Sequence, residues 1–149
     1  MKPRGRFHFP LETVLKVRLL REDQAKQELA RARNQLARSR QALSETESHF
    51  ARTLGYISDA PQKVWDAPHY LMSWRFLEHL KLAVEGWRER VAQEEAGVAE
   101  HVLTLQRRHQ ERRVLERLRE RKFAEFRRDL TKFLENETEA IILARWPHS

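Results

Sequence analysis

Few side chains in this sequence could do chemistry, and their spacing forms no catalytic or metal-binding group. The seven histidines are scattered, and the two that fall two helical turns apart, His101 and His109, have arginines nearby that would repel a metal cation. The adjacent carboxylates Glu94 and Glu95 belong to a polar helical stretch in which water solvates them. The sequence contains no H-E-x-x-H, P-loop or nucleophile-elbow motif. We therefore predict a protein that is not an enzyme and that has no cofactor, metal or small-molecule substrate.

The composition indicates a single, strongly helical domain. The 149 residues include 34% charged and 40% hydrophobic side chains, with only four glycines and five prolines. This is too charged for a bulky globular core and too rich in Leu, Val and Phe for a disordered tail. The sequence has no Cys, so a disulfide framework and a thiolate zinc site are excluded. The uncharged stretches are shorter than the roughly 20 residues of a membrane span, and we expect a soluble, cytoplasmic protein.

Proline marks the ends of two long predicted helices. No proline lies between Leu11 and Ala60 or between His69 and Trp146, and a proline inside a helix would cost about 3 kcal/mol. The composition of both stretches agrees, because Ala, Leu, Glu, Gln, Lys and Arg dominate them. We predict an N-terminal arm over residues 1–10, a helix over 11–57, a loop over 58–67 and a second helix over 68–145, all in one coiled-coil domain over 1–149.

Both predicted helices carry one apolar ladder with a seven-residue repeat. A single acidic residue, Glu22, interrupts the ladder of the first helix. One ladder per helix requires one partner helix, and the short link folds the chain back on itself. We therefore predict an all-α fold of two long helices in an antiparallel coiled-coil hairpin. The ladder residues are Leu15, Leu29, Leu36, Leu43, Phe50 and Ile57 in the first helix and Leu77, Val84, Val91, Val98 and Leu105 in the second.

The length of the link predicts the register of the hairpin. Facing residues of an antiparallel pair have numbers with a constant sum, and a sum of about 123, uncertain by one heptad, suits the loop. This register puts Leu36 beside Trp87. It also puts Glu22 beside His101, which would explain why both ladders become polar there. The first helix then runs out opposite about Arg112, so the second helix overhangs it.

The overhang of the second helix is not polar on all sides. Apolar residues return at helical spacing after the basic stretch, and an apolar stripe without an internal partner is typical of a binding surface. Two alternatives remain open: the N-terminal arm, with Phe7 and Phe9, folds over the stripe, or two copies of the chain pair there. The stripe residues are Phe123, Phe126, Leu130, Phe133 and Leu134, followed by Ile141 and Ile142.

Positive charge gathers where the hairpin brings the two basic stretches side by side. Residues 1–21 contain 6 basic and 1 acidic side chains, and residues 106–122 contain 8 basic and 3 acidic ones, so each stretch carries +5. Such an end attracts an acidic protein surface or nucleic acid, unless it is only a solvated face. A bZIP-like role in DNA binding is disfavoured because the basic stretch lies inside a helix that is already paired upstream. We predict a protein partner and no nucleic acid.

Two stretches of the sequence resemble the FliJ family of flagellar type III export proteins. Residues 6–18 read R-F-H-F-P-L-E-T-V-L-K-V-R and are similar to the family's opening pattern R-F-x-F/P-L-x-x-V-L-x-x-R. Residues 114–122 read V-L-E-R-L-R-E-R-K and resemble the family's C-terminal LExLxERK signature. Together with the length and the two-helix pattern, the resemblance covers almost the whole chain.

The resemblance implies a coiled coil similar to the central stalk of rotary ATPases. The end of such a stalk that carries both termini inserts into the hexameric flagellar export ATPase, and the family also contacts the cytoplasmic domain of the export gate membrane protein and free export chaperones. Leu80 and Trp87 also belong to the predicted core, so both roles stay open for them. The expected ATPase-facing residues are Arg107, Arg108, Arg112, Arg113, Phe123, Phe126, Leu130 and Phe133, and the expected gate-facing residues are Phe76, Leu80, Ala83 and Trp87.

The working hypothesis is therefore a non-enzymatic stalk and chaperone component of the export apparatus. It would promote assembly of the ATPase ring and couple hydrolysis to export, from a cytoplasmic position peripheral to the inner membrane at the flagellar base. The alternatives are an injectisome stalk of the same architecture, a structural coiled-coil adaptor or homodimer, and, less favoured, a helical nucleic-acid-binding protein.

Overall fold

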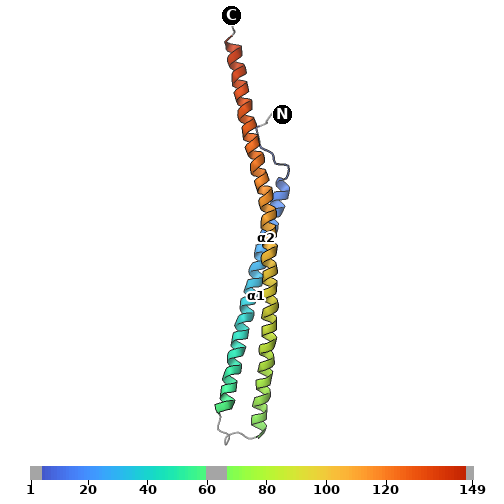
Figure 1. The fold of residues 1–149 in the computed structure, drawn as a ribbon, viewed down its shortest axis with the longest axis vertical. Helices are drawn as coiled ribbons and strands as arrows, with labels where there is room; N and C mark the ends of the chain where they lie inside the picture. Colours follow the sequence, from blue (N-terminus) through green and yellow to red (C-terminus); the bar gives the residue numbers. More distant parts are fainter. Residues whose placement is uncertain (1–4, 60–66, 147–149) are drawn as a thin grey trace. The chain divides into compact units, whose positions relative to one another are not determined.

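The structure of the chain, a computed structural model, describes residues 5–59 and 67–146. These residues form two long helices, α1 over Glu12–Asp59 and α2 over Ala67–Arg145, with no strand among them. Segments of α1 and α2 run antiparallel beside each other (Figure 1). The predicted all-α helical hairpin is therefore confirmed.

The helix bounds differ from the expected ones by no more than two residues. α1 begins one residue later and ends two residues later than expected, while α2 begins one residue earlier and ends at the expected residue, Arg145. Residues 60–66 of the expected loop and residues 1–4 of the expected arm lie outside the described residues.

Local signals explain where the helices begin and end. The amide of Glu12 donates to the carbonyl of Phe9 over 3.1 Å, which forms the turn into α1, and the Glu12 carboxylate stands in the first turn, where the helix dipole favours negative charge. Pro68 is the second residue of α2, a position that needs no amide donor. Arg145 lies in the last turn of α2, where a positive charge is favourable.

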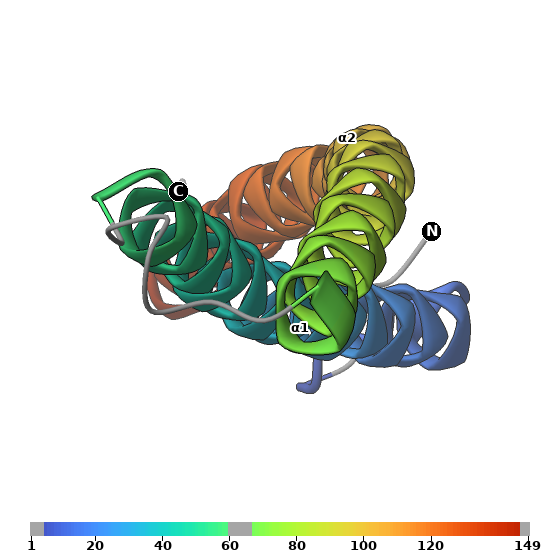
Figure 2. The ribbon, with the colours of Figure 1, turned by 90° about the horizontal axis from the view of Figure 1, so that it is seen from below.

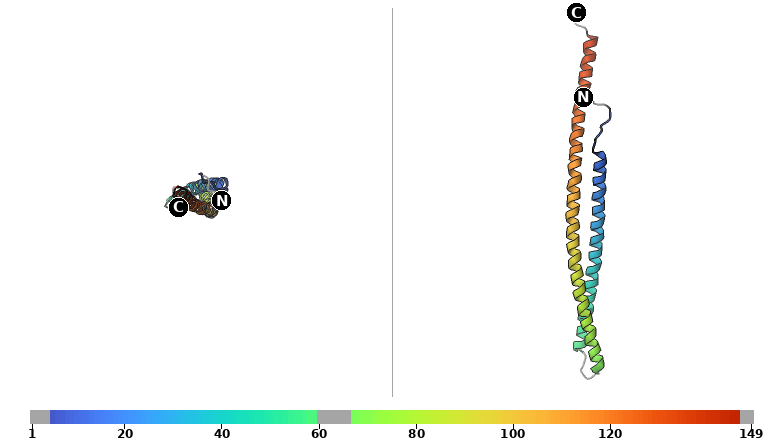
Figure 3. Two further views of the ribbon diagram at one scale, coloured as in Figure 1. Left: turned by 90° about the horizontal axis from the view of Figure 1, so that it is seen from above. Right: turned by 90° about the vertical axis from the view of Figure 1, so that its right-hand side faces the viewer.

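The contacts divide the chain into two compact units. The terminal unit consists of Met1–Gln24 and Gln106–Ser149, and the central unit is Ala25–Leu105. In the central unit the last turns of α1 neighbour the first turns of α2 (Figure 2). In the terminal unit the first turns of α1 lie against a later part of α2, and α2 continues past them (Figure 3).

Apolar ladder residues form the core of the central unit. Each helix contributes side chains that are almost completely buried, and most of them belong to the predicted ladders. Because each helix has a single partner, only one narrow face of each is covered, and many large apolar side chains remain exposed. The buried apolar residues are Ala25, Leu29, Leu36 and Ile57 from α1 and Leu77, Leu80, Val84 and Val91 from α2.

The register of the helix pair is displaced from the expected one by about twelve residues, which is more than the one heptad of uncertainty in the prediction. In the central unit Arg40 pairs with Glu95 over 3.0 Å and Glu47 pairs with Arg88 over 3.5 Å. The residue numbers of these pairs add to about 135 rather than about 123. A seven-residue repeat makes registers that differ by whole heptads nearly equivalent for apolar residues, so polar contacts decide between them.

Candidate functional site

A buried acidic residue organises the terminal unit. Glu22, the exception in the apolar ladder, is only 4% exposed. Arg112 donates a hydrogen bond from Nε to its carboxylate, and His109 Nδ1 lies 3.2 Å from the other carboxylate oxygen. The position of Glu22 beside His109 and Arg112 corrects the expectation that it would face His101. The register error causes the difference.

Arg112 is a structural ion-pair partner and not a free surface cation. Its side chain is only 17% exposed and contacts Glu116 as well as Glu22. The hydrogen bond that Arg112 donates to Glu22 raises the pKa of Arg112 above its ordinary value, against the opposing effect of burial. The expected role of Arg112 in attracting a partner is therefore secondary to its role inside the hairpin.

The other three expected arginines differ in how freely they face solvent. Arg108 pairs with Glu111 over 3.4 Å, and Arg113 pairs with Glu116 over 3.3 Å. Arg107 is exposed, and within residues 5–59 and 67–146 no ion pair involves it. The basic stretch therefore keeps a net positive charge, although Arg108 and Arg113 are each paired with a neighbouring glutamate of α2.

The Glu111 carboxylate joins the two helices across the same surface. Arg18 of α1 lies 2.5 Å from it, and Arg108 approaches it from within α2. Burial opposes ionisation of Glu111, but the charges of Arg18 and Arg108 outweigh it and lower the pKa of the carboxyl. Glu12 and Arg119 form a further cross-helix pair over 2.8 Å.

The N-terminal arm covers the beginning of the apolar stripe on α2. The Phe7 ring lies edge-on to Phe123, with centroids 5.2 Å apart, and 5.7 Å from the Phe126 ring. The Arg119 guanidinium stacks over the Phe7 ring at 5.5 Å. Of the two arrangements left open by the sequence, the structure contains the one in which the arm folds over the stripe. Phe123 and Phe126 are therefore partly occupied within the chain.

The stripe continues after Phe126 without an α1 segment beside it. Leu130 and Phe133 are half-buried, and large apolar side chains after them are mostly exposed. In Figure 3 this part of α2 extends past the first turns of α1. The exposed apolar residues of this segment are Leu134, Ile141, Ile142, Leu143 and Trp146.

The four expected gate-facing residues divide between core and surface. Leu80 is only 7% exposed and belongs to the core. Trp87 and Ala83 are half-buried, and the Arg90 guanidinium stacks over the Trp87 ring at 5.2 Å. Phe76 is 44% exposed and is the most accessible of the four. A contact role for Leu80 is therefore disfavoured by its burial.

Phe76 lies beside α1 residues that the sequence analysis did not connect with it. Its ring lies 5.5 Å from the His49 ring of α1, edge to face, at the rim of a shallow hollow of about 480 Å³. The exposed Tyr56 contributes to the same hollow, seven residues after His49 and so on the same face of α1. We name this the Phe76 surface; its lining residues are His49, Arg52, Thr53, Tyr56, Ile57, Ser73 and Phe76.

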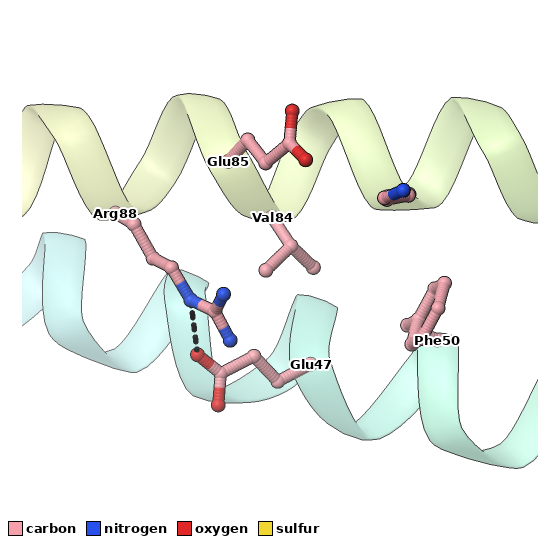
Figure 4. Close-up of a pocket in the computed structure, with 6 residues that line it drawn as sticks. Glu47, Phe50, Val84, Glu85 and Arg88 are labelled. Carbon is pink, nitrogen blue, oxygen red and sulfur yellow. Dashed lines mark ion pairs between the residues drawn. The ribbon is translucent and has the colours of Figure 1, made fainter.

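A second hollow of the central unit, of about 330 Å³, has an apolar floor and a charged rim (Figure 4). Phe50 and Val84 form the floor, and Glu47 and Arg88 form an ion pair of 3.5 Å at the rim. Phe76 and Arg88 are twelve positions apart, which corresponds to about 120° around the helix, so the two hollows lie on different sides of α2. The rim carries equal numbers of acidic and basic side chains, so charge gives this hollow no preference for a partner.

Two kinds of feature are absent from the part of the chain that the structure describes: a membrane-spanning helix and a cluster of metal-ligating side chains. Neither helix contains a stretch long and apolar enough to cross a bilayer. Within residues 5–59 and 67–146, no three His, Cys, Asp or Glu side chains gather in a way that could hold a metal ion.

Comparison with known proteins identifies the family of the chain. No curated protein and no solved structure matches the chain. The family model described as Flagellar FliJ protein matches residues 7–133. This range includes the arm from Phe7 onward, all of α1, and α2 as far as the first half of the apolar stripe. The chain therefore belongs to the FliJ family and is a component of the flagellar protein-export apparatus.

Proposed function

We propose that the chain is a non-enzymatic stalk of the export apparatus and that its terminal unit binds the hexameric export ATPase. The observation that carries this proposal is the extension of α2 past α1. There, an exposed apolar stripe follows directly on a stretch with +5 net charge. Apolar area supplies affinity and positive charge steers an acidic partner surface.

Different residues contribute to these two effects. Arg107 is exposed and Arg108 and Arg113 are partly exposed, so they can act at long range on an acidic surface. Leu130 and Phe133 offer apolar area that no α1 segment covers, and Phe123 and Phe126 add to it where the arm leaves them accessible. The ATP chemistry would belong to the partner.

We further propose that the Phe76 surface binds the cytoplasmic domain of the export gate. Phe76 is accessible beside His49 and Tyr56, while Ala83 and Trp87 lie half-buried further along α2. An accessible aromatic residue at the edge of a shallow hollow is the type of residue that is enriched at protein interfaces. Export chaperones are a third expected class of partner. Such contacts would hold the protein on the cytoplasmic side of the inner membrane.

Removal of residues 130–149 tests the ATPase contact. The truncation leaves Phe7, Phe123 and Phe126 in place, so we expect the rest of the hairpin to remain helical in circular dichroism. We expect stimulation of the purified export ATPase, measured by phosphate release, to fall to the basal rate. The matched control is Thr131→Ala, which changes an exposed polar residue of the same segment. Full stimulation by the truncated protein would refute the ATPase assignment.

A homodimeric adaptor is the second candidate. The exposed apolar residues of α2 favour it, because such side chains can pair between two copies as readily as with another protein. Sedimentation equilibrium at micromolar concentration separates the two, since the stalk proposal requires a monomer under these conditions.

A further inference from the structure

The aromatic contact between the arm and α2 has the geometry of a bound ligand side chain. Phe7 lies across Phe123 and Phe126, with Arg119 over the ring. Arg119 is itself fixed by Glu12 at 2.8 Å. The ring therefore sits in a small site with two aromatic walls and a cation above it, and an aromatic side chain from another molecule would find the same partners.

Among the described residues of the arm, 5–10, Phe9 is the one that is almost completely buried. Phe9 is 4% exposed, and its carbonyl accepts the amide of Glu12. Phe7 is only half-buried, and its neighbours Arg6 and His8 are exposed. Phe7 can therefore leave its site by rotation about the backbone before Phe9, and neither α1 nor the buried Phe9 needs to move.

Charge opposes the closed position of the arm. The described arm residues, 5–10, contain the basic side chain Arg6 and no acidic one. The α2 stretch 106–122 carries +5. Like charges repel, so a basic arm is a poor electrostatic match for this part of α2, whereas an acidic segment would be a good one.

We propose that the arm is a displaceable cover and that Phe7 holds the place of an aromatic side chain from an acidic partner segment. This proposal rests on the proposed ATPase contact and deepens it. It states the chemistry of the segment that binds at Phe123 and Phe126, and it makes opening of the arm part of binding.

The cover has a measurable thermodynamic consequence. A partner that needs the open arm binds with an affinity reduced by the fraction of molecules that are open. If about one molecule in ten is open, removal of the Phe7 ring strengthens binding about tenfold. The effect requires no new contact with the partner.

A fluorine probe reports the position of the arm without the ATPase. Trifluoromethyl-phenylalanine at position 7 should give a resonance shifted by the neighbouring rings, and Phe123→Ala should move it toward the value of a free side chain. The binding probe is a synthetic peptide of Asp and Glu with two Phe residues, and its control replaces both Phe residues by Ala.

The two peptides give opposite expected results. The Phe peptide should move the fluorine resonance to the free value and bind Phe7→Ala about tenfold more tightly than the unchanged chain. The Ala peptide should do neither. The proposal is overturned if the Phe peptide does not bind, if it binds without moving the resonance, or if both peptides behave alike.

The export ATPase then tests the same site in its proposed setting. We expect Phe7→Ala to bind the ATPase about tenfold more tightly and His8→Ala, which changes an exposed arm residue, to bind like the unchanged chain. Equal or weaker binding by Phe7→Ala would mean that the arm is no cover. If neither protein binds the ATPase while the peptide results hold, the proposed function fails and the aromatic site remains.

Discussion

Glu22 stands at a ladder position where other heptads of α1 carry leucine, phenylalanine or isoleucine. A carboxylate at such a position is costly to bury unless it is paired, and Arg112 and His109 provide the pairing. The other positions of the α1 ladder are apolar and cannot form an ion pair with Arg112. The ion pair therefore forms only when Glu22 lies beside the turn of α2 that contains His109 and Arg112. The single polar residue therefore selects the register that the apolar ladder leaves open.

We expect Glu22→Ala to destabilise the hairpin by about 3 kcal/mol, because the mostly buried Arg112 would lose its cross-helix carboxylate and keep only Glu116 of its own helix. Chemical unfolding followed by circular dichroism gives the free energy. The control is Glu22→Leu together with Arg112→Leu, which removes both charges and should recover most of the stability. A single variant as stable as the original chain would contradict the role of this pair.

At the scale of the helix, α2 presents different side chains on different faces of one turn. Leu77 and Leu80 point to the core, and Phe76 faces the hollow beside His49. A variant of a core residue and a variant of the exposed neighbour should therefore separate stability from binding.

We expect Phe76→Ala to weaken binding of the gate's cytoplasmic domain at least tenfold with little change in unfolding free energy, because Phe76 is 44% exposed. Leu80→Ala should instead destabilise the hairpin by about 2–4 kcal/mol, since it removes a buried side chain. Calorimetric titration and thermal unfolding measure the two effects. The reverse pattern, with binding lost only in Leu80→Ala, would contradict the assignment of the Phe76 surface.

The helices were predictable from the sequence, but several contacts between them were not. Proline spacing located both helices because a proline inside a helix is so costly. The predicted register was wrong by more than one heptad, because apolar ladders alone do not distinguish registers that differ by whole heptads. The Phe76 surface was missed since His49 and Tyr56 lie beside the ladder on α1 and come next to Phe76 only when the two helices are paired.

At the scale of the whole molecule, ion pairs between or along the helices accompany the apolar core in both units. In the central unit, contacts from Ser39, together with Arg90, lower the pKa of Glu94 despite partial burial. In the terminal unit, Arg18 and Arg108 lower the pKa of Glu111 against the effect of burial. The pKa of each carboxyl is therefore lower than its ordinary value of 4.5, and both groups stay ionised at a more acidic pH than a free glutamate does.

We expect the melting temperature to be constant above about pH 5 and to fall as the pH drops below 4.5. A carboxyl group with a lowered pKa in the folded state stabilises that state above its ordinary pKa and ceases to do so when it is protonated. Protonation also raises the net charge above +7, which increases repulsion. Thermal unfolding between pH 3 and pH 7 measures this, and Glu111→Gln should show a smaller decrease. A melting temperature that rises on acidification would contradict it.

The helix α2 belongs to both units and runs for 79 residues without a break. Its first turns contain Phe76 and its last third contains the apolar stripe, and the backbone hydrogen bonds of a single helix run from one to the other. An α-helix resists torsion much better than a jointed chain does. Within the terminal unit, a rotation imposed on the last turns of α2 would accordingly pass along the helix to the turns that Glu12 and Glu22 hold against α1.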